Sequence, residues 1–234
     1  MKAVLKYPGA KNRLASWICG YIPEHKVYLE PYAGSLAVLF NKPRSHIETV
    51  NDLDGNITNF FKVLRDNADE LIAKIKLTPF SRREYKDAYE NCSNSETEQA
   101  RVFAVKCWMG FGCGNLYQNG FKSGQQSRSP NPARAWSKLQ ETLEQATERL
   151  KGVQIENLPA VELIKRYNTE DVFMHYDNEL YNGMLPGWKK VYKDTQAEFG
   201  LKRQEVLWMN YDIGQMTLKT AEEYADMPTP MPAT

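Results

Sequence analysis

The stretch Tyr28–Phe40 constrains the fold of this chain more than any other. It predicts a short buried strand over 27–32, a tight turn at Gly34 and Ser35, and a helix over 35–41. In an α/β protein such a turn lies at the carboxyl end of a strand, where small ligands bind. Backbone amides at the start of the following helix would face such a ligand.

A second apolar strand, expected over 46–51, ends in the acidic segment Asn51–Asp54. An acid at the end of the next strand of a βαβ unit is the usual partner of ribose hydroxyls. This spacing fits a nucleotide-type ligand, and it fits an ordinary βαβ unit with a capping Asp equally well.

Composition narrows the class of protein. The chain has 234 residues and a formal net charge of +1, which suits one sizeable core with a smaller inserted domain. Its four cysteines show no Cys-x-x-Cys spacing, and its three histidines are scattered, so we expect a reduced cytoplasmic setting without a metal site. Apolar runs stay well short of about 18 residues and no signal peptide opens the chain, so a membrane protein or a secreted one is not expected.

The rest of the chain predicts further elements in the following order. Helices are expected around 14–21, at 57–75, around Arg82, Arg83 and Lys86, at 99–109, 134–150, 160–167 and 179–185, and strands at 153–157, 172–176, 189–197 and 206–211. The last two strands form a hairpin turned near Phe199-Gly200, and the Pro-rich tail 227–234 is expected to be disordered.

Between Arg101 and Lys138 there are six basic residues and no acidic one. Within this stretch, 110–124 is rich in Gly, Asn and aromatic residues, and Asn119-Gly120 predicts a type I′ hairpin turn. Such a basic hairpin suits a groove of nucleic acid, although a flexible surface loop would have a similar composition. Six residues are expected to contact DNA. The basic residues Lys122 and Arg128 would contact phosphates, the amide side chains of Asn119, Gln125 and Gln126 would reach base edges, and the aromatic Tyr117 would also contact the DNA.

Taken together, these motifs resemble the D12 class of DNA adenine-N6 methyltransferases, the family of the Dam enzyme. The resemblance runs from Lys2 to about Tyr211. It rests on Lys6-Tyr-Pro-Gly-Ala-Lys11, Glu30-Pro-Tyr-x-Gly-Ser35, Asn51-Asp-Leu-Asp54, the hairpin segment Gly110–Gly124 and the last strand Glu205–Tyr211.

The resemblance implies a Rossmann-like sheet that binds S-adenosylmethionine, here lacking about one strand. The methyltransferase-like domain would span 1–77 and 136–226, with a target-recognition domain inserted at 78–135. The cofactor-binding positions would be Lys11, Glu30, Gly34 and Asp52.

The first motif departs from the family pattern, which is roughly aromatic-x-Gly-x-Gly. We interpret Ala33 and Leu36 as replacements of the phenylalanine and of the second glycine. A branched side chain at Leu36 would clash with the cofactor, and such overpacking costs about 1–3 kcal/mol. We therefore expect no cofactor, or S-adenosylmethionine if the family site survives.

The second departure concerns catalysis. The family uses Asp-Pro-Pro-Tyr after the fourth strand, and here 172–176 runs directly into Asp177–Leu185. The simplest explanation is a deletion that removed this motif, a helix and the fifth strand. Asn178 and Tyr181 are weak catalytic candidates, because Glu179 and Leu180 replace both prolines, and 178 fits a helix N-cap better.

Loss of a central strand would leave ladder hydrogen bonds unmade. We therefore expect either that the fourth strand pairs directly with the terminal hairpin or that a protein partner covers the gap.

The resulting prediction is a pseudoenzyme in the cytoplasm of a bacterial or phage-infected cell. It would bind double-stranded DNA or a DNA-associated protein, and by analogy it would act in phage–host conflict as an inhibitor of a host defence nuclease. An active adenine-N6 methyltransferase with a rebuilt site is the alternative, and binding to an acidic protein surface is a third.

Overall fold

The computed structural model describes residues 1, 3–113, 117–124, 130–167, 172–174, 189–196 and 202–209. The chain divides into two compact units, each assembled from separate segments. We call them the helical unit (Met1–Asn12, Gly34–Phe40 and Asp54–Lys151) and the sheet unit (Arg13–Ala33, Asn41–Leu53 and the described residues after Lys151).

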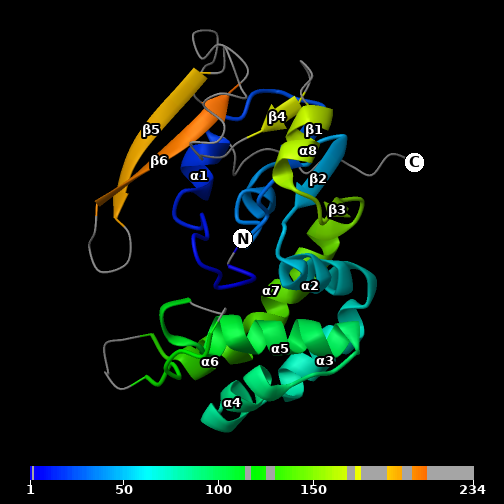
Figure 1. Ribbon diagram of the computed structural model, residues 1–234, viewed down its shortest axis with the longest axis vertical. Helices are drawn as coiled ribbons and strands as arrows, with labels where there is room; N and C mark the ends of the chain where they lie inside the picture. Colours follow the sequence, from blue (N-terminus) through cyan, green and yellow to red (C-terminus); the bar gives the residue numbers. More distant parts are fainter. Residues whose placement is uncertain are drawn as a thin grey trace. The chain divides into compact units, whose positions relative to one another are not determined.

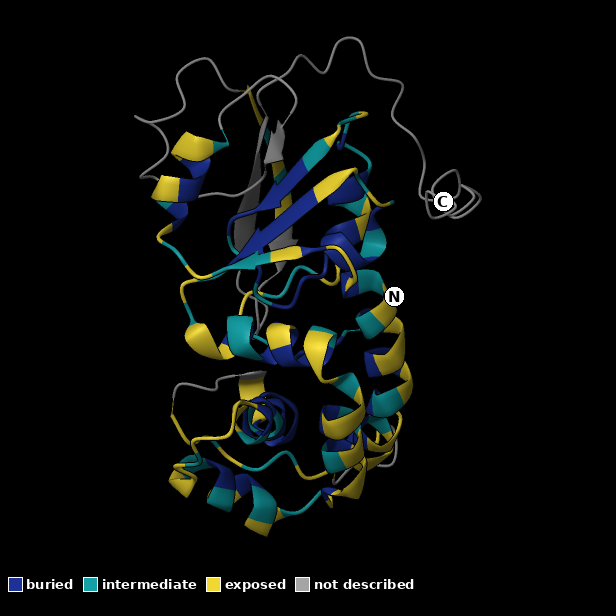
Figure 2. Cartoon of the chain, turned by 90° about the vertical axis from the view of Figure 1, so that its right-hand side faces the viewer, coloured by how far each residue is buried: buried dark blue, intermediate teal, exposed yellow. Residues whose placement is uncertain are grey.

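The sheet unit contains a small parallel sheet (Figure 1). Its strands are β1 (Val27–Glu30), β2 (Ile47–Asn51), β3 (Gln154–Glu156) and β4 (Val172–Met174), in the order β3-β2-β1-β4. The two central strands are mostly buried and appear dark blue in Figure 2, as expected for parallel strands covered on both faces. Each of these four strands was predicted within a few residues.

Helices complete this unit around the sheet. The short α1 (Ala15–Cys19) precedes β1, and α8 (Ala160–Arg166) connects β3 to β4. Leu163 and Ile164 of α8 pack with Leu29 of β1 in a buried cluster, since they lie on one face of the helix.

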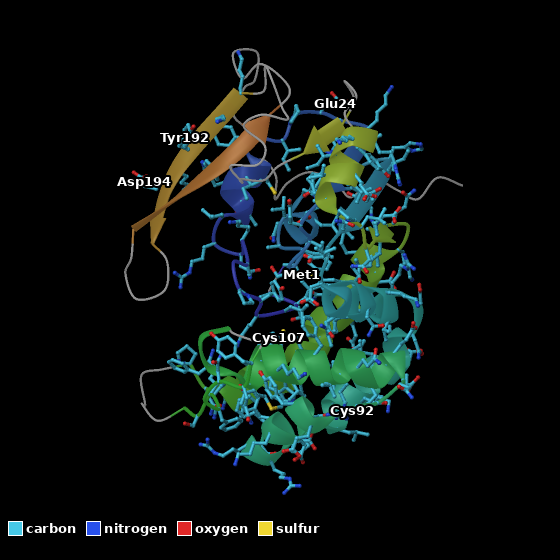
Figure 3. The ribbon with its side chains drawn as sticks, viewed as in Figure 1. Met1, Glu24, Cys92, Cys107, Tyr192 and Asp194 are labelled. Atoms are coloured by element: carbon cyan, nitrogen blue, oxygen red, sulfur yellow. The ribbon has the colours of Figure 1, made fainter. Side chains whose placement is uncertain are left out.

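Strands β5 (Lys189–Gln196) and β6 (Lys202–Met209) form a separate antiparallel sheet. Figure 3 shows the side chains of Tyr192 and Asp194 projecting from β5, and both are exposed. On the opposite face the Lys193 ammonium lies 4.9 Å from the centre of the Trp17 ring. Over the described residues β4 pairs with β1, and no ladder joins β4 to the hairpin. The remainder of the strands predicted at 172–176 and 206–211 lies outside the described residues, so the direct pairing of β4 with the hairpin stays a prediction.

A buried polar network lies beside β1 and β2. The Lys42 ammonium donates to the carboxylate of Glu48 (2.7 Å) and to Ser45 Oγ (2.7 Å), and it lies 4.4 Å from the centre of the Tyr28 ring. His25 Nε2 is 2.7 Å from the same Ser45 oxygen. These contacts give each buried charge a partner.

The helical unit is built from α2 (Gly55–Asp66), α3 (Ala68–Leu77), α4 (Arg82–Glu90), α5 (Glu96–Met109), α6 (Pro132–Ser137) and α7 (Leu139–Leu150), with a short 3₁₀ turn η2 (Phe111–Cys113). Four of these helices begin at side chains that accept a hydrogen bond from the first turn, and these N-caps are Asp54, Ser81, Ser95 and Asn131. The apolar residues that recur at helical spacing within the helix expected at 57–75 are all buried, namely Ile57, Phe60, Phe61, Leu64, Leu71 and Ile75.

Three expected elements differ. The single helix at 57–75 is two helices, because Asn67 adopts non-helical angles (φ −139°, ψ 47°). The helix at 134–150 is likewise divided into α6 and α7 at Lys138. In place of the helix at 35–41 there is a 3₁₀ turn η1 (Leu39–Asn41), since Leu36 has a left-handed φ of 53° that a right-handed helix cannot accommodate.

The predicted type I′ turn at Asn119-Gly120 is also absent. That turn needs positive φ at both central residues, and neither residue has it. The predicted helix at 179–185, the hairpin turn near 199–200 and the tail 227–234 lie outside the described residues. No helix within the described ranges is long and apolar enough to cross a membrane.

Candidate functional site

The carboxyl ends of β1, β2 and β3 are tied together by one side chain. The Asn51 amide donates to the carbonyls of Pro31 (2.9 Å) and Leu158 (3.0 Å), and its oxygen accepts from the Leu158 N–H (2.8 Å). All of its partners are backbone groups that follow a strand. Asn51 therefore sets the shape of the sheet edge at which α/β proteins bind ligands.

Asp52 and Leu53 are the next two residues after Asn51 at this edge of the sheet. Asp52 is partly exposed, and its carbonyl accepts from the Asn157 amide (2.6 Å). Leu53 is 70% exposed, although it is a large apolar residue. A carboxylate beside an open apolar side chain suits a ligand that carries hydroxyl groups and a flat apolar ring.

Glu30 is placed differently from Asp52. It is buried, and its carboxylate accepts a hydrogen bond of 3.0 Å from the Tyr28 hydroxyl. Burial, followed by the charge of Glu30, raises the pKa of Tyr28 well above its ordinary value. Glu30 is thus engaged inside the sheet unit, and its expected role toward a cofactor stays a prediction.

The N-terminal motif is ordered in the helical unit. Pro8-Gly9 forms a tight turn closed by the Ala10 N–H on the Tyr7 carbonyl (3.1 Å), with Gly9 at φ +73°. The Tyr7 hydroxyl donates to the carboxylate of Asp54 (3.2 Å), the N-cap of α2. Lys11 lies partly exposed just after this turn.

Gly34 and Ser35 belong to the same unit. Gly34 has a φ of +47°, which favours glycine, and a Cβ there would meet only Tyr7, at an ordinary contact distance of 3.7 Å. Ser35 Oγ is buried and makes no hydrogen bond to any residue that the structure describes. A buried hydroxyl without a partner is unusual in proteins, and a bound ligand is one way to satisfy it.

Leu36 is fully buried, and its expected clash with a cofactor stays a prediction. Its left-handed backbone carries a separate cost, typically about 1–2 kcal/mol for a residue with a side chain. Counted back from Leu36, the aromatic position of the family pattern is Tyr32 and not Ala33, so the aromatic residue is present.

Residues 117–124, which we call the recognition segment, are fixed to two helices of the helical unit. Its backbone pairs with the end of α5, through Lys122 N–H to Met109 carbonyl (2.8 Å) and Phe111 N–H to Gly120 carbonyl (2.8 Å). On α4, Tyr85 Oη bonds both backbone groups of Asn119. The segment thus has a defined place in the fold.

The predicted DNA-contacting residues divide into three groups. Tyr117 is 69% exposed, whereas Asn119 and Lys122 are partly buried. Gln125, Gln126 and Arg128 lie outside the described residues, as do the weak catalytic candidates Asn178 and Tyr181. The described part of the chain contains no group of three or more His, Cys, Asp or Glu that could hold a metal ion.

Sequence reasoning missed two residues that matter here. Tyr85 gave only a weak signal, its spacing of four from Tyr89 on a predicted helix. Phe121 was grouped with the other aromatics of the segment, yet it packs against Phe80 (ring centres 5.2 Å apart) and under the Arg82 guanidinium (5.0 Å).

Figure 3 also locates Cys92 and Cys107, of which Cys92 is exposed and Cys107 buried.

The sequence is similar to known DNA adenine methyltransferases. Over 71 residues, 30% of this chain, the sequence is 32% identical to the DNA N-6-adenine-methyltransferase of Escherichia phage P1. The chain spans only 9% of that relative's length. The family model of the D12 class N6 adenine-specific DNA methyltransferases matches residues 7–178, well over half of the chain. The chain therefore belongs to the D12 class of N6 adenine-specific DNA methyltransferases.

Proposed function

We propose that this chain binds double-stranded DNA through the recognition segment and does not methylate it. The observation that carries the proposal is the segment itself, a short stretch fixed on α4 and α5 that exposes Tyr117 and contains Lys122. It lies within a 38-residue stretch that has six basic residues and no acidic one. In a groove of duplex DNA an exposed aromatic side chain contacts base edges, and a cation neutralises phosphate.

The absence of methyl transfer is argued from the sequence after β4. The family's Asp-Pro-Pro-Tyr does not occur anywhere in this chain. A proline pair holds a carbonyl rigidly toward the amino group of the flipped adenine, and Glu179 and Leu180 do not have that stiffness. The family match also ends at residue 178, next to the proposed junction.

The sheet unit nonetheless keeps residues that fit S-adenosylmethionine, which supplies a methyl group on a sulfonium ion when it is bound. Asp52 would accept hydrogen bonds from ribose hydroxyls, and Leu53, which is 70% exposed, would offer an apolar surface to an adenine ring. These residues are the reason to keep an active methyltransferase as the second candidate.

DNA binding is tested by fluorescence anisotropy on a random-sequence duplex across a range of salt concentrations. Lys122→Ala should weaken affinity and reduce the slope of log K against log salt by about 1. The matched control is Lys62→Ala, which removes an exposed lysine of α2 that pairs with Glu96. Equal slopes for Lys122→Ala and the unaltered chain would argue against DNA contact by this segment.

Methyl transfer is tested with labelled S-adenosylmethionine and duplex DNA. We expect no N6-methyladenine above the level of a Tyr181→Ala variant. Product made by the unaltered chain but not by that variant would establish the active alternative. The expected role as a nuclease inhibitor stays a prediction, and a pull-down with and without nuclease treatment separates DNA-borne partners from direct ones.

A further inference from the structure

We propose that Tyr85 is a positioning residue that determines which DNA sequence the recognition segment selects. This inference rests on the proposed function, because it assigns a cause to the selectivity of the same segment. Tyr85 is almost completely buried on α4 and does not itself reach solvent, so its effect must pass through the residues that it holds.

The contact is made to main-chain atoms. The Tyr85 hydroxyl donates to the Asn119 carbonyl (3.0 Å) and accepts from the Asn119 N–H (3.0 Å). One oxygen therefore satisfies both backbone groups of one residue. Such a pair of bonds fixes the orientation of the peptide on either side of Asn119, and hence the direction in which neighbouring side chains leave the segment.

Phe121 provides a second anchor, against α4 and against Phe80, which lies two residues before α4 begins. Its ring lies 5.2 Å from that of Phe80 and 6.1 Å from that of Tyr85, with the Arg82 guanidinium 5.0 Å away. Asn119, the residue expected at a base edge, and Lys122, expected at a phosphate, are thus presented by a backbone that is held at Asn119 and Phe121. Contacts to base edges discriminate only when they are placed within a few tenths of an ångström, whereas phosphate contacts tolerate looser placement.

The test compares Tyr85→Phe with Tyr89→Phe. Both changes remove one hydroxyl from α4. Among the described residues, the Tyr89 hydroxyl lies 3.5 Å from the Tyr85 hydroxyl and makes no hydrogen bond to the recognition segment. In the free protein, hydrogen exchange at the Asn119 amide should become faster in Tyr85→Phe and stay unchanged in Tyr89→Phe.

On DNA, selection from a pool of random duplexes gives the preferred sequence of the unaltered chain. Tyr85→Phe should lower the preference for that sequence over random duplex about tenfold, the effect of losing bonds worth about 1.4 kcal/mol. Its affinity for random duplex and its salt slope should not change. Tyr89→Phe should keep the full preference.

The outcomes separate the two proposals. If the unaltered chain does not bind duplex DNA, the proposed function fails and this inference fails with it. If the unaltered chain selects a sequence and Tyr85→Phe selects it equally well, only the inference is overturned. If Tyr85→Phe does not fold, Phe121→Leu is used in its place, because it weakens the packing of the recognition segment on Phe80, Arg82 and Tyr85. An undiminished preference of Phe121→Leu for the selected sequence over random duplex also overturns the inference.

Discussion

Lys42 and Glu48 form an ion pair of 2.7 Å in which both side chains are almost fully removed from solvent, at 1% and 3% exposure. The pair lies in the sheet unit, where Ser45 and the Tyr28 ring also contact the ammonium. A buried pair of this kind contributes little net stability by itself, but breaking it leaves one charge without a partner.

Lys42→Met should therefore lower the free energy of unfolding by about 3–5 kcal/mol, because Glu48 would stay charged and buried. The double variant Lys42→Met/Glu48→Leu should lose clearly less, since it removes both charges. Urea denaturation monitored by circular dichroism gives the two values. If the double variant proves as unstable as the single one, the loss comes from packing rather than from an unpaired charge.

His25 makes stability depend on pH. Burial is the largest cause that lowers the pKa of His25 below its ordinary value, and the Lys42 charge adds to it, while the Pro23 carbonyl acts in the opposite direction. The unfolded chain therefore takes up a proton first as the pH falls through about 6.5. Stability attributable to His25 should be unaffected above that pH and should decrease below it, until the folded state is also protonated.

This prediction is checked by the unfolding free energy of the unaltered chain and of His25→Gln from about pH 7.5 to about pH 5.5. The unaltered chain should lose more stability over this interval than the variant. If the unfolding free energies of the two proteins change equally with pH, His25 has the same pKa in the folded and the unfolded state.

Alanine is ordinarily more stabilising than glycine, but at position 36 we expect the glycine variant to be the more stable one. Both Leu36→Gly and Leu36→Ala lose a fully buried side chain, which costs about 2–5 kcal/mol. Alanine keeps the strain of a φ of 53°, whereas glycine removes it. Leu36→Gly should therefore be more stable than Leu36→Ala by about 1 kcal/mol, as measured by thermal unfolding, and the opposite order would contradict a left-handed Leu36.

Asn51 should be sensitive to a nearly isosteric change. Asn51→Asp keeps an acceptor for the Leu158 N–H but loses the two donated bonds to the Pro31 and Leu158 carbonyls and places a charge in a buried site. We expect a loss of about 3 kcal/mol or more in unfolding free energy. The control is Asn157→Asp, which removes one donated bond at an exposed position and should cost far less.

The sequence predicted the parallel strands and the helical core because both depend on patterns repeated over several residues. β1, β2 and the buried face of α2 and α3 follow directly from the spacing of Leu29, Val50, Phe60 and their neighbours. The helix at 35–41 could not be predicted correctly, because the deciding feature was the backbone angle of one residue, Leu36, which carries no compositional signal.

The candidate site shows the same limit. Motif spacing placed Asp52 at the edge of the sheet and identified 110–124 as a distinct segment. It did not reveal that Asn119 is held by Tyr85, 34 positions earlier in the chain. Hydrogen bonds from a side chain to a distant backbone group produce no repeating pattern in the sequence. The prediction of a type I′ turn at Asn119-Gly120 was wrong for the same reason, since the long-range bonds between Tyr85 and Asn119 override the local turn preference.

The bonds between Tyr85 and Asn119 use only main-chain atoms of the recognition segment, and every residue type except proline has these atoms. Side chains at 117–119 can therefore be exchanged without removing the tether. Under the proposed DNA-binding function, a chain of this design would acquire a new target sequence through few mutations, and a library randomised at these three positions would serve as a starting point for engineering that change.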